Sequence, residues 1–262
     1  MRTLPHRFAA RFLPKGWRDL LRQLLLFCGA YWLYRLVRGQ TDGRVAEAFN
    51  HARELIHLEQ ALGLFVEPTV NAWAEGRRGV IDLASWMYVN SHFTITTTAL
   101  AFIYLYRNQS FYFIRNMFLV AMGIALVLYA AFPTAPPRFM PEWGFSDSVA
   151  RFTGLTASGS SADALYNPFA AVPSMHVAFA LMIGVPMASM ARHRWAKALW
   201  SVYPLMVTFV VVATANHWWF DAFTGAVTAA ISAVVALQFA RWRPSAWAWM
   251  PGGPAVATRQ AV

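Results

Sequence analysis

Two histidines in this chain each stand at the start of an apolar run. His176 lies in the segment AVPSMHVAFA, and His217 opens the segment HWWFDAFTG, in which Asp221 follows four residues later. Two imidazoles can divide a reaction, one attacking as a nucleophile and the other donating a proton to the leaving group. Asp221 is spaced to lie on the same helix face as His217 and to hold one ring nitrogen protonated. His217 is therefore the candidate nucleophile and His176 the candidate general acid.

A phosphate ester is the substrate class that these residue types suit, because an arginine is also available. Arg138 in TAPPRF could bind two phosphate oxygens at once, and its charge is permanent. Helices that start near Ser174 and Asn216 could also point backbone N–H groups at an anion. His92 and Tyr88, from an earlier apolar run, are possible further members, although a structural hydrogen bond explains His92 at least as well.

The composition indicates where such a site would lie. Of the 262 residues, 58% are hydrophobic and 13% are charged, which is too apolar for a soluble protein. The net charge of +10 does not predict a nucleic-acid partner, because the basic residues are spread through short segments between apolar runs. The single cysteine, Cys28, excludes a disulfide within the chain. These features predict a membrane protein surrounded by lipid.

Six apolar runs are near the length that crosses a bilayer, which predicts an all-α polytopic membrane protein with six transmembrane helices. They cover about Leu20–Val37, Val80–Tyr106, Phe111–Phe132, Val172–Met190, Ala196–Ala215 and Trp218–Ala240. Trp218 and Trp219 at the start of the last run are typical of the aromatic belt at a membrane interface.

The segments between these runs complete one domain, residues 1–262. Residues 38–79 form a connection whose apolar residues recur at helical spacing between charged ones, which predicts an amphipathic helix at the interface. Residues 133–171 form a long loop that precedes His176, and within it TASGSSADA, Thr156 to Ala164, indicates a flexible piece. The two tails are residues 1–19 and 241–262.

The distribution of Lys and Arg predicts the orientation. Basic residues gather in both tails and in the links after the second and fourth runs, so both termini are expected on the cytoplasmic side of the cell membrane. The first connection carries mixed charge and does not follow this asymmetry. With this orientation Arg138, His176 and His217 all reach the same extracytoplasmic level, where the active site is expected.

The PSMH segment ending at His176 and the HWWFD segment from His217 to Asp221 resemble the second and third signature motifs of the phosphatidic acid phosphatase type 2 superfamily. TAPPRF, YVNSHF and LEQALGLFVE are similar to its inositol phosphorylceramide synthase-like branch, and the resemblance extends roughly over Leu55 to Ala240. It implies a six-helix membrane fold and a phosphohistidine intermediate made without metal or cofactor. His176 would be the acid, His217 the nucleophile and Asp221 its orienting partner.

The chain departs from the superfamily pattern at two phosphate-binding cations. Ala131 stands where the first motif has lysine, and Val210 and Val211 stand where the third motif has Ser-Arg. Arg138 would then supply most of the charge neutralisation. The implied substrate is a lipid phosphate, with water, a polyol or a lipid hydroxyl as acceptor. The sequence does not distinguish a phosphatase from a phosphotransferase, and it leaves the oligomeric state open.

Two other functions fit parts of the pattern. Two histidines and a carboxylate are also a plausible metal ligand set, which would suit a metal-dependent membrane hydrolase. A transporter could carry polar residues within its spans, but it would be expected to show broken helices in paired halves, and the sequence has no such symmetry. Either histidine alone could be a hydrogen-bonded packing residue, whereas ionisable groups gathered at one membrane level are usually functional.

Overall fold

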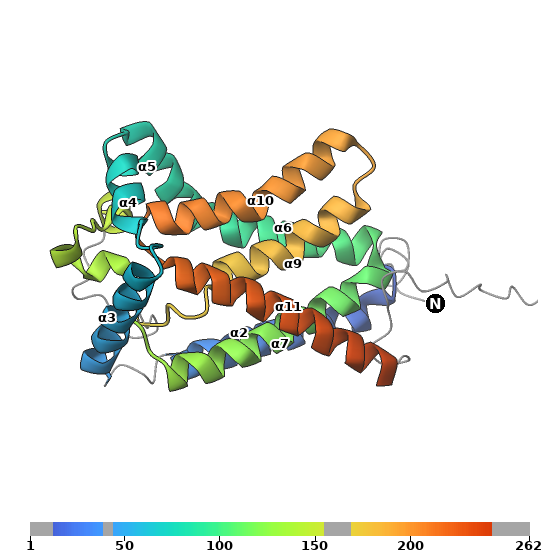
Figure 1. The fold of residues 1–262 in the computed structure, drawn as a ribbon. Helices are drawn as coiled ribbons and strands as arrows, with labels where there is room; N and C mark the ends of the chain where they lie inside the picture. The colour runs from blue at the N-terminus through green and yellow to red at the C-terminus, as the bar shows by residue number, and fades with distance from the viewer. Residues whose placement is uncertain (1–12, 39–43, 155–168, 243–262) are drawn as a thin grey trace, which may run out of the picture.

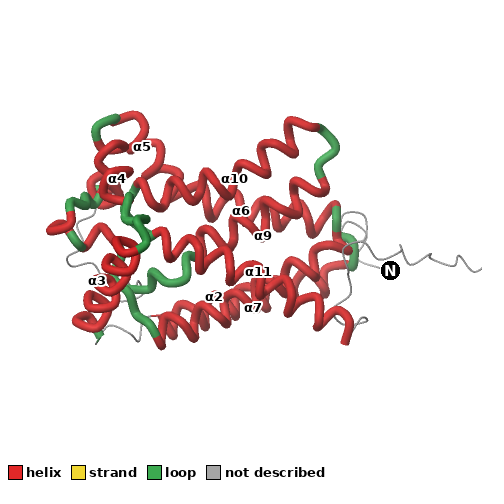
Figure 2. The backbone as a smooth tube through the Cα atoms, viewed as in Figure 1, coloured by secondary structure: helices red, strands yellow, loops and turns green. Residues whose placement is uncertain are grey.

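The computed structural model describes residues 13–38, 44–154 and 169–242, which form helices and loops without a strand (Figure 2). The longer helices run roughly along one direction, and the short ones gather at one end of this bundle (Figure 1). The all-α prediction is confirmed for the described residues. The helices of the bundle are α2 (Gly16–Arg38), α6 (His92–Tyr106), α7 (Asn108–Ala131), α9 (Met175–Met190), α10 (Arg194–Ala213) and α11 (Trp219–Trp242).

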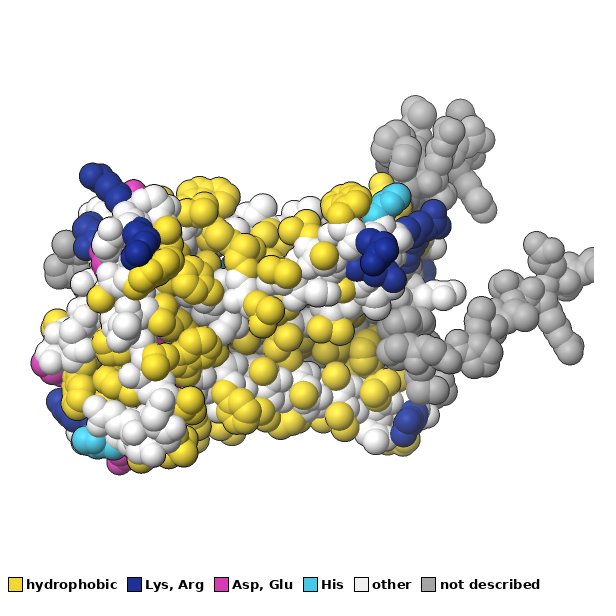
Figure 3. All heavy atoms as spheres, turned by 45° about the horizontal axis from the view of Figure 1, so that its top comes forward, with side chains coloured by type: hydrophobic (Ala, Val, Ile, Leu, Met, Phe, Trp, Pro, Cys, Tyr) yellow, Lys and Arg dark blue, Asp and Glu magenta, His cyan; other side chains and the backbone are white. Residues whose placement is uncertain are grey.

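Among the described helices, α7, α10 and α11 are long and apolar enough to cross a membrane, and α9 is a shorter apolar helix. Large side chains on their outer faces are exposed, such as Leu205 at 69% and Phe223 at 65%. Figure 3 shows hydrophobic side chains over the middle of one face and charged ones at its two ends. This pattern is that of a membrane protein, while the arrangement with six spans remains a prediction.

The second apolar run differs from a regular helix. It forms α5 (Arg78–Trp86) and α6, joined by a π-helical segment, Met87–Ser91. The side chains of Asn90 and Ser91 donate to backbone carbonyls four residues earlier, at 3.1 and 2.6 Å. A π-helical turn holds more residues than an α-helical turn and is frequent at functional sites. Here it changes which side chains of this run face the bundle interior.

The end of the bundle is covered by α3 (Val45–Ala61), α4 (Glu67–Glu75) and α8 (Ser148–Thr153). The predicted amphipathic helix is therefore present as α3, and the same connection also contains α4. The buried face of α3 includes Ile56, whose burial contributes roughly 1.5–3 kcal/mol. The segment Thr156–Ala164, predicted to be flexible, lies outside the described residues.

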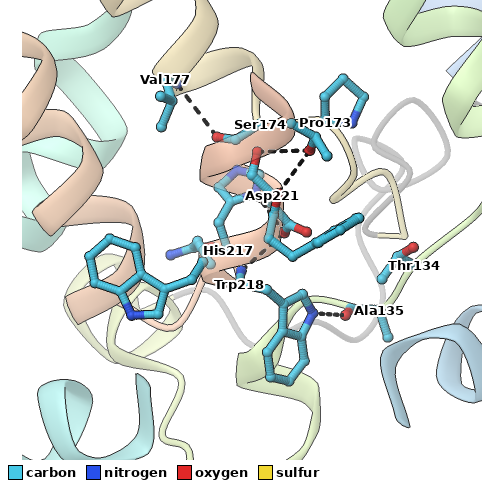
Figure 4. Close-up of polar contacts among 12 residues, drawn as sticks. Thr134, Ala135, Pro173, Ser174, Val177, His217, Trp218 and Asp221 are labelled. Atoms are coloured by element: carbon cyan, nitrogen blue, oxygen red, sulfur yellow. Dashed lines mark hydrogen bonds and ion pairs between the residues drawn. The ribbon is translucent and has the colours of Figure 1, made fainter. Parts of the chain in front are cut away.

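A cluster of buried residues joins α3 to the loop after α7 and to the start of α11. Ile56, Ala135, Met140 and Trp218 belong to it. Trp218 is completely buried, and its indole N–H donates to the carbonyl of Ala135 at 2.9 Å (Figure 4). The sequence interpretation of Trp218 as part of an interface belt is therefore wrong. Its ring fills the junction between the bundle and the short helices. Burial of the indole is tolerated there because its N–H has a hydrogen-bond acceptor.

Candidate active site

His217 and Asp221 form a buried pair at the start of α11 (Figure 4). His217 Nδ1 lies 3.1 Å from Asp221 Oδ2, and that oxygen also accepts the backbone N–H of Trp218 at 3.0 Å. Asp221 is fully buried and His217 is 6% exposed. A carboxylate at Nδ1 favours the tautomer whose proton is on that nitrogen, so the lone pair of Nε2 is available for attack.

The turn that carries His217 is closed by backbone hydrogen bonds. The N–H groups of Asn216 and His217 both donate to the carbonyl of Val211, at 3.0 and 3.1 Å. Ala215 adopts a φ of 54°, a left-handed conformation that is uncommon for residues other than glycine. The end of α10 thus fixes the backbone of His217 before α11 begins at Trp219.

The start of α9 is attached to the first turn of α11. The backbone N–H of Ser174 donates to the carbonyl of Asp221 at 3.0 Å, and Ser174 Oγ caps α9 with Val177 N 3.5 Å away (Figure 4). Gly225 permits this close approach, because a Cβ at that position would lie 2.4 Å from the carbonyl oxygen of Ser174. The two helix starts are therefore adjacent, as the sequence predicts.

His176 enters the site from this first turn of α9. Its ring centroid lies 5.6 Å from that of His217, 4.5 Å from that of His92 and 4.7 Å from that of Tyr88. The Tyr88 ring is nearly parallel to the imidazole, at 27°. His92 and Tyr88, the possible members named from the sequence, thus contact the candidate general acid, and the π-helical segment lies between α5 and α6 at this point.

A small pocket lies beside His176. Val210 and Val211, which stand where the superfamily motif has Ser-Arg, both contribute to it. Its wall is therefore apolar at the position of the missing cation. It is lined by Met87, Tyr88, Ser91, His92, His176, Val207, Val210 and Val211.

Arg138 reaches the site through Asn216. Its Nη1 donates to Asn216 Oδ1, its backbone N–H donates to the carbonyl of Ala215 at 2.8 Å, and its Nε lies 3.7 Å from Asp147 Oδ2. The Arg138 side chain is 9% exposed. The guanidinium is thus held next to the residue that precedes His217. Asn216, a possible site residue by sequence, thus accepts from this arginine, and its side-chain NH₂ donates to Thr214.

Two glutamates occupy the start of α11, which corrects one expectation. Trp219 N–H donates to Glu67 Oε1 at 3.0 Å, and Phe220 N–H donates to Glu59 Oε1 at 2.9 Å. The prediction that the last helix offers free N–H groups to a phosphate is therefore wrong, because protein carboxyl groups already take the favourable position at the positive end of the helix. At the start of α9 the N–H of Ser174 donates to Asp221 and that of Val177 lies 3.5 Å from Ser174 Oγ, and a phosphate contact there remains a prediction.

Sequence reasoning missed Glu59, Glu67 and Asp147. A signal for Glu59 was present: it falls on the apolar stripe of α3 with Ala52 and Ile56, and a carboxyl on a buried helix face needs a partner. Glu67, like Glu59, also lies in the segment LEQALGLFVE that carries part of the family resemblance, whereas Asp147 had no comparable signal. In the described part of the chain, no group of three or more His, Cys, Asp or Glu residues is placed to hold a metal ion.

Comparison with known proteins bears on this arrangement. The family model described as the PAP2 superfamily matches residues 53–235, a segment that includes every residue of the site. The comparisons with curated proteins and with solved structures give no match. The match does not extend to the inositol phosphorylceramide synthase-like branch, which remains a prediction. A buried histidine–aspartate pair that faces a second histidine, with an arginine beside it, thus lies within the matched segment, and the chain belongs to the PAP2 superfamily.

Proposed function

We propose that this protein is an integral-membrane phosphatase or phosphotransferase that acts on a lipid phosphate ester through a phosphohistidine formed on His217. One observation carries the proposal: His217 is bound through Nδ1 to the buried carboxylate of Asp221, and the imidazole of His176 lies 5.6 Å from it, ring centre to ring centre. Superfamily membership suggests the same reaction class.

The proposed reaction has two steps. In the first, His217 Nε2 attacks phosphorus, the bond from phosphorus to the leaving oxygen breaks, and protonated His176 gives its proton to that oxygen. In the second, a water or alcohol attacks the phosphohistidine, the N–P bond breaks, and His176 takes the proton of the attacking group. Arg138 would bind the phosphate oxygens and stabilise the negative charge of both transition states.

The acceptor in the second step decides between the two activities. Water would give a phosphatase, whereas a polyol or a lipid hydroxyl would give a transferase. The similarity of TAPPRF, YVNSHF and LEQALGLFVE to the inositol phosphorylceramide synthase-like branch is the reason to include inositol among the acceptors. Purified protein in lipid should be incubated with a panel of labelled lipid-phosphate donors, with and without inositol, and the products identified by mass spectrometry. Free phosphate alone would indicate a phosphatase, and a new phosphoester would indicate a transferase.

The metal-dependent alternative makes a different prediction for the same assay. The phosphohistidine route should be unaffected by chelators and inhibited by orthovanadate, which adopts the five-coordinate geometry of phosphoryl transfer. Activity that is lost to a chelator and restored by zinc would contradict our proposal and favour a metal-dependent hydrolase.

We also propose six spans, cytoplasmic termini and an extracytoplasmic site at the cell membrane. The basic residues in both tails and in the links after the second and fourth apolar runs support this orientation. With Cys28 replaced by serine, an impermeant thiol reagent should label Glu142→Cys on intact cells and should label His193→Cys only after permeabilisation. Both native side chains are exposed. The reverse labelling pattern would overturn the orientation.

A further inference from the structure

Two buried glutamates outside the reacting groups converge on the helix that follows His217. Glu59 lies in the last turn of α3 and Glu67 is the first residue of α4. They are 2% and 0% exposed. Gly63, with a φ of 69°, turns the chain between them. Two helices that are distant from α11 in the sequence thus place one carboxyl group each at its start.

The contacts account for three consecutive backbone N–H groups. Trp218 donates to Asp221, Trp219 donates to Glu67 and Phe220 donates to Glu59, at distances of 3.0, 3.0 and 2.9 Å. The first N–H groups of a helix have no partner within the helix, and a buried helix start leaves them without water. The carboxyl oxygens satisfy these N–H groups as hydrogen-bond acceptors.

This arrangement has an energetic cost that a purely structural cap would avoid. Burial, together with the hydrogen bond and the charge of Glu67, raises the pKa of Glu59 to about 9. A serine or asparagine cap would satisfy a helix start without placing two carboxyl groups in a buried space. This cost suggests that the protein requires the first turn of α11 in one fixed position.

We propose that Glu59 and Glu67 are positioning residues for the phosphoryl-transfer reaction, which hold the first turn of α11 so that Asp221 orients the imidazole of His217. The inference rests on the proposed function. The two carboxyl groups also exclude the phosphate from the start of α11, which leaves the anion to Arg138 and to the start of α9. Two helices at the end of the bundle thereby act on the nucleophile without contact to the substrate.

Alanine substitutions at the two positions test the inference with two independent measurements. Glu59→Ala and Glu67→Ala should raise the rate of hydrogen exchange in the peptide 217–224 at least about tenfold, because each variant removes an acceptor of a first-turn N–H. They should also lower kcat for a lipid phosphate by about 10- to 100-fold with KM within about threefold, since the nucleophile is misplaced while the phosphate contacts remain.

Matched variants separate positioning from general destabilisation. Glu54→Ala removes an exposed carboxylate from the same helix and should leave both measurements unchanged. Glu59→Gln keeps a carbonyl oxygen for Phe220 N–H at the same reach and should restore slow exchange and most of kcat. If the alanine variants fail to fold, Glu59→Asp and Glu67→Asp carry the test, because they withdraw the carboxyl group by one methylene and should lower kcat in the same way.

Each remaining outcome would overturn the inference. Unchanged exchange in the alanine variants would mean that the carboxyl groups do not hold the first turn. Faster exchange with unchanged kcat would mean that the turn is held but does not position His217. A parent protein without phosphoryl transfer to any acceptor would contradict the proposed function instead, and the exchange measurement would still decide whether the two carboxyl groups hold the start of α11.

Discussion

The two histidines of the site lie 5.6 Å apart, ring centre to ring centre, in unlike surroundings. His217 contacts the buried carboxylate of Asp221, and the backbone around it is closed by hydrogen bonds. His176 lies against the rings of Tyr88 and His92 and lines a small, largely apolar pocket. A nucleophile must keep one tautomer and one orientation, whereas a general acid must lose and regain a proton in every turnover. The fixed surroundings of His217 support the role of nucleophile that we propose for it.

Removal of each imidazole should separate their roles, and the largest effect is expected at the nucleophile. His217→Ala should lower turnover on the order of 10⁴-fold or more and form no phosphoprotein. His176→Ala should still accumulate a phosphoprotein from a donor with a good leaving group, because such a group departs without a proton. An acid-labile, base-stable label on the intact protein measures the intermediate. Label that persists in His217→Ala would assign the nucleophile elsewhere.

The carboxylate beside His217 should have the next largest effect. Asp221→Asn keeps a side chain of the same size but removes the charge that stabilises the imidazolium, so kcat should fall on the order of 10²-fold or more. The fall should be seen in single-turnover formation of the phosphoprotein. Formation at the parental rate would mean that Asp221 serves only as a cap for the N–H of Trp218.

Arg138 should contribute through transition-state charge without being needed for folding. Arg138→Ala should lower kcat/KM by about 10²- to 10³-fold and still elute as a folded protein in detergent. Arg138→Lys should recover only part of this loss, because lysine cannot bind two oxygens in the planar geometry of arginine. Loss of the folded protein in Arg138→Ala would instead assign the residue a structural role through Asn216 and Asp147.

The rings beside His176 should have the smallest effect. His92→Gln and Tyr88→Phe should each retain activity within about tenfold, because in the mechanism that we propose the leaving group takes its proton from His176. The pH profile of kcat should be measured in both variants, because it reports proton transfer directly. A loss as large as that in His176→Ala would mean that His92 takes part in proton transfer and that the contrast between the two histidines is less sharp than the geometry indicates.

The residues with short-range patterns were predictable from the sequence. The pair His217 and Asp221 follows from helical spacing and His176 from its place at the start of another apolar run, and the structure places the three together. The partners of Arg138 and of the first turn of α11 were not predictable, because Glu59 and Phe220 are 161 residues apart and their hydrogen bond depends on how α3 docks. Sequence periodicity also gives no indication of the π-helical segment, since α6 carries apolar side chains on both its buried and its exposed face and a shift in helical phase leaves no mark on such a pattern.

Gly225 has a consequence for the geometry of the reaction. It lies one turn beyond Asp221 and faces the carbonyl of Ser174, two residues before His176. A methyl group there would have to push the two helices apart by roughly 1 Å before ordinary van der Waals distances were restored. The absence of a side chain at Gly225 therefore sets how close His176, in the first turn of α9, can lie to His217, which precedes α11. In the reaction that we propose, one phosphoryl group would have to fit within this distance between the two imidazoles.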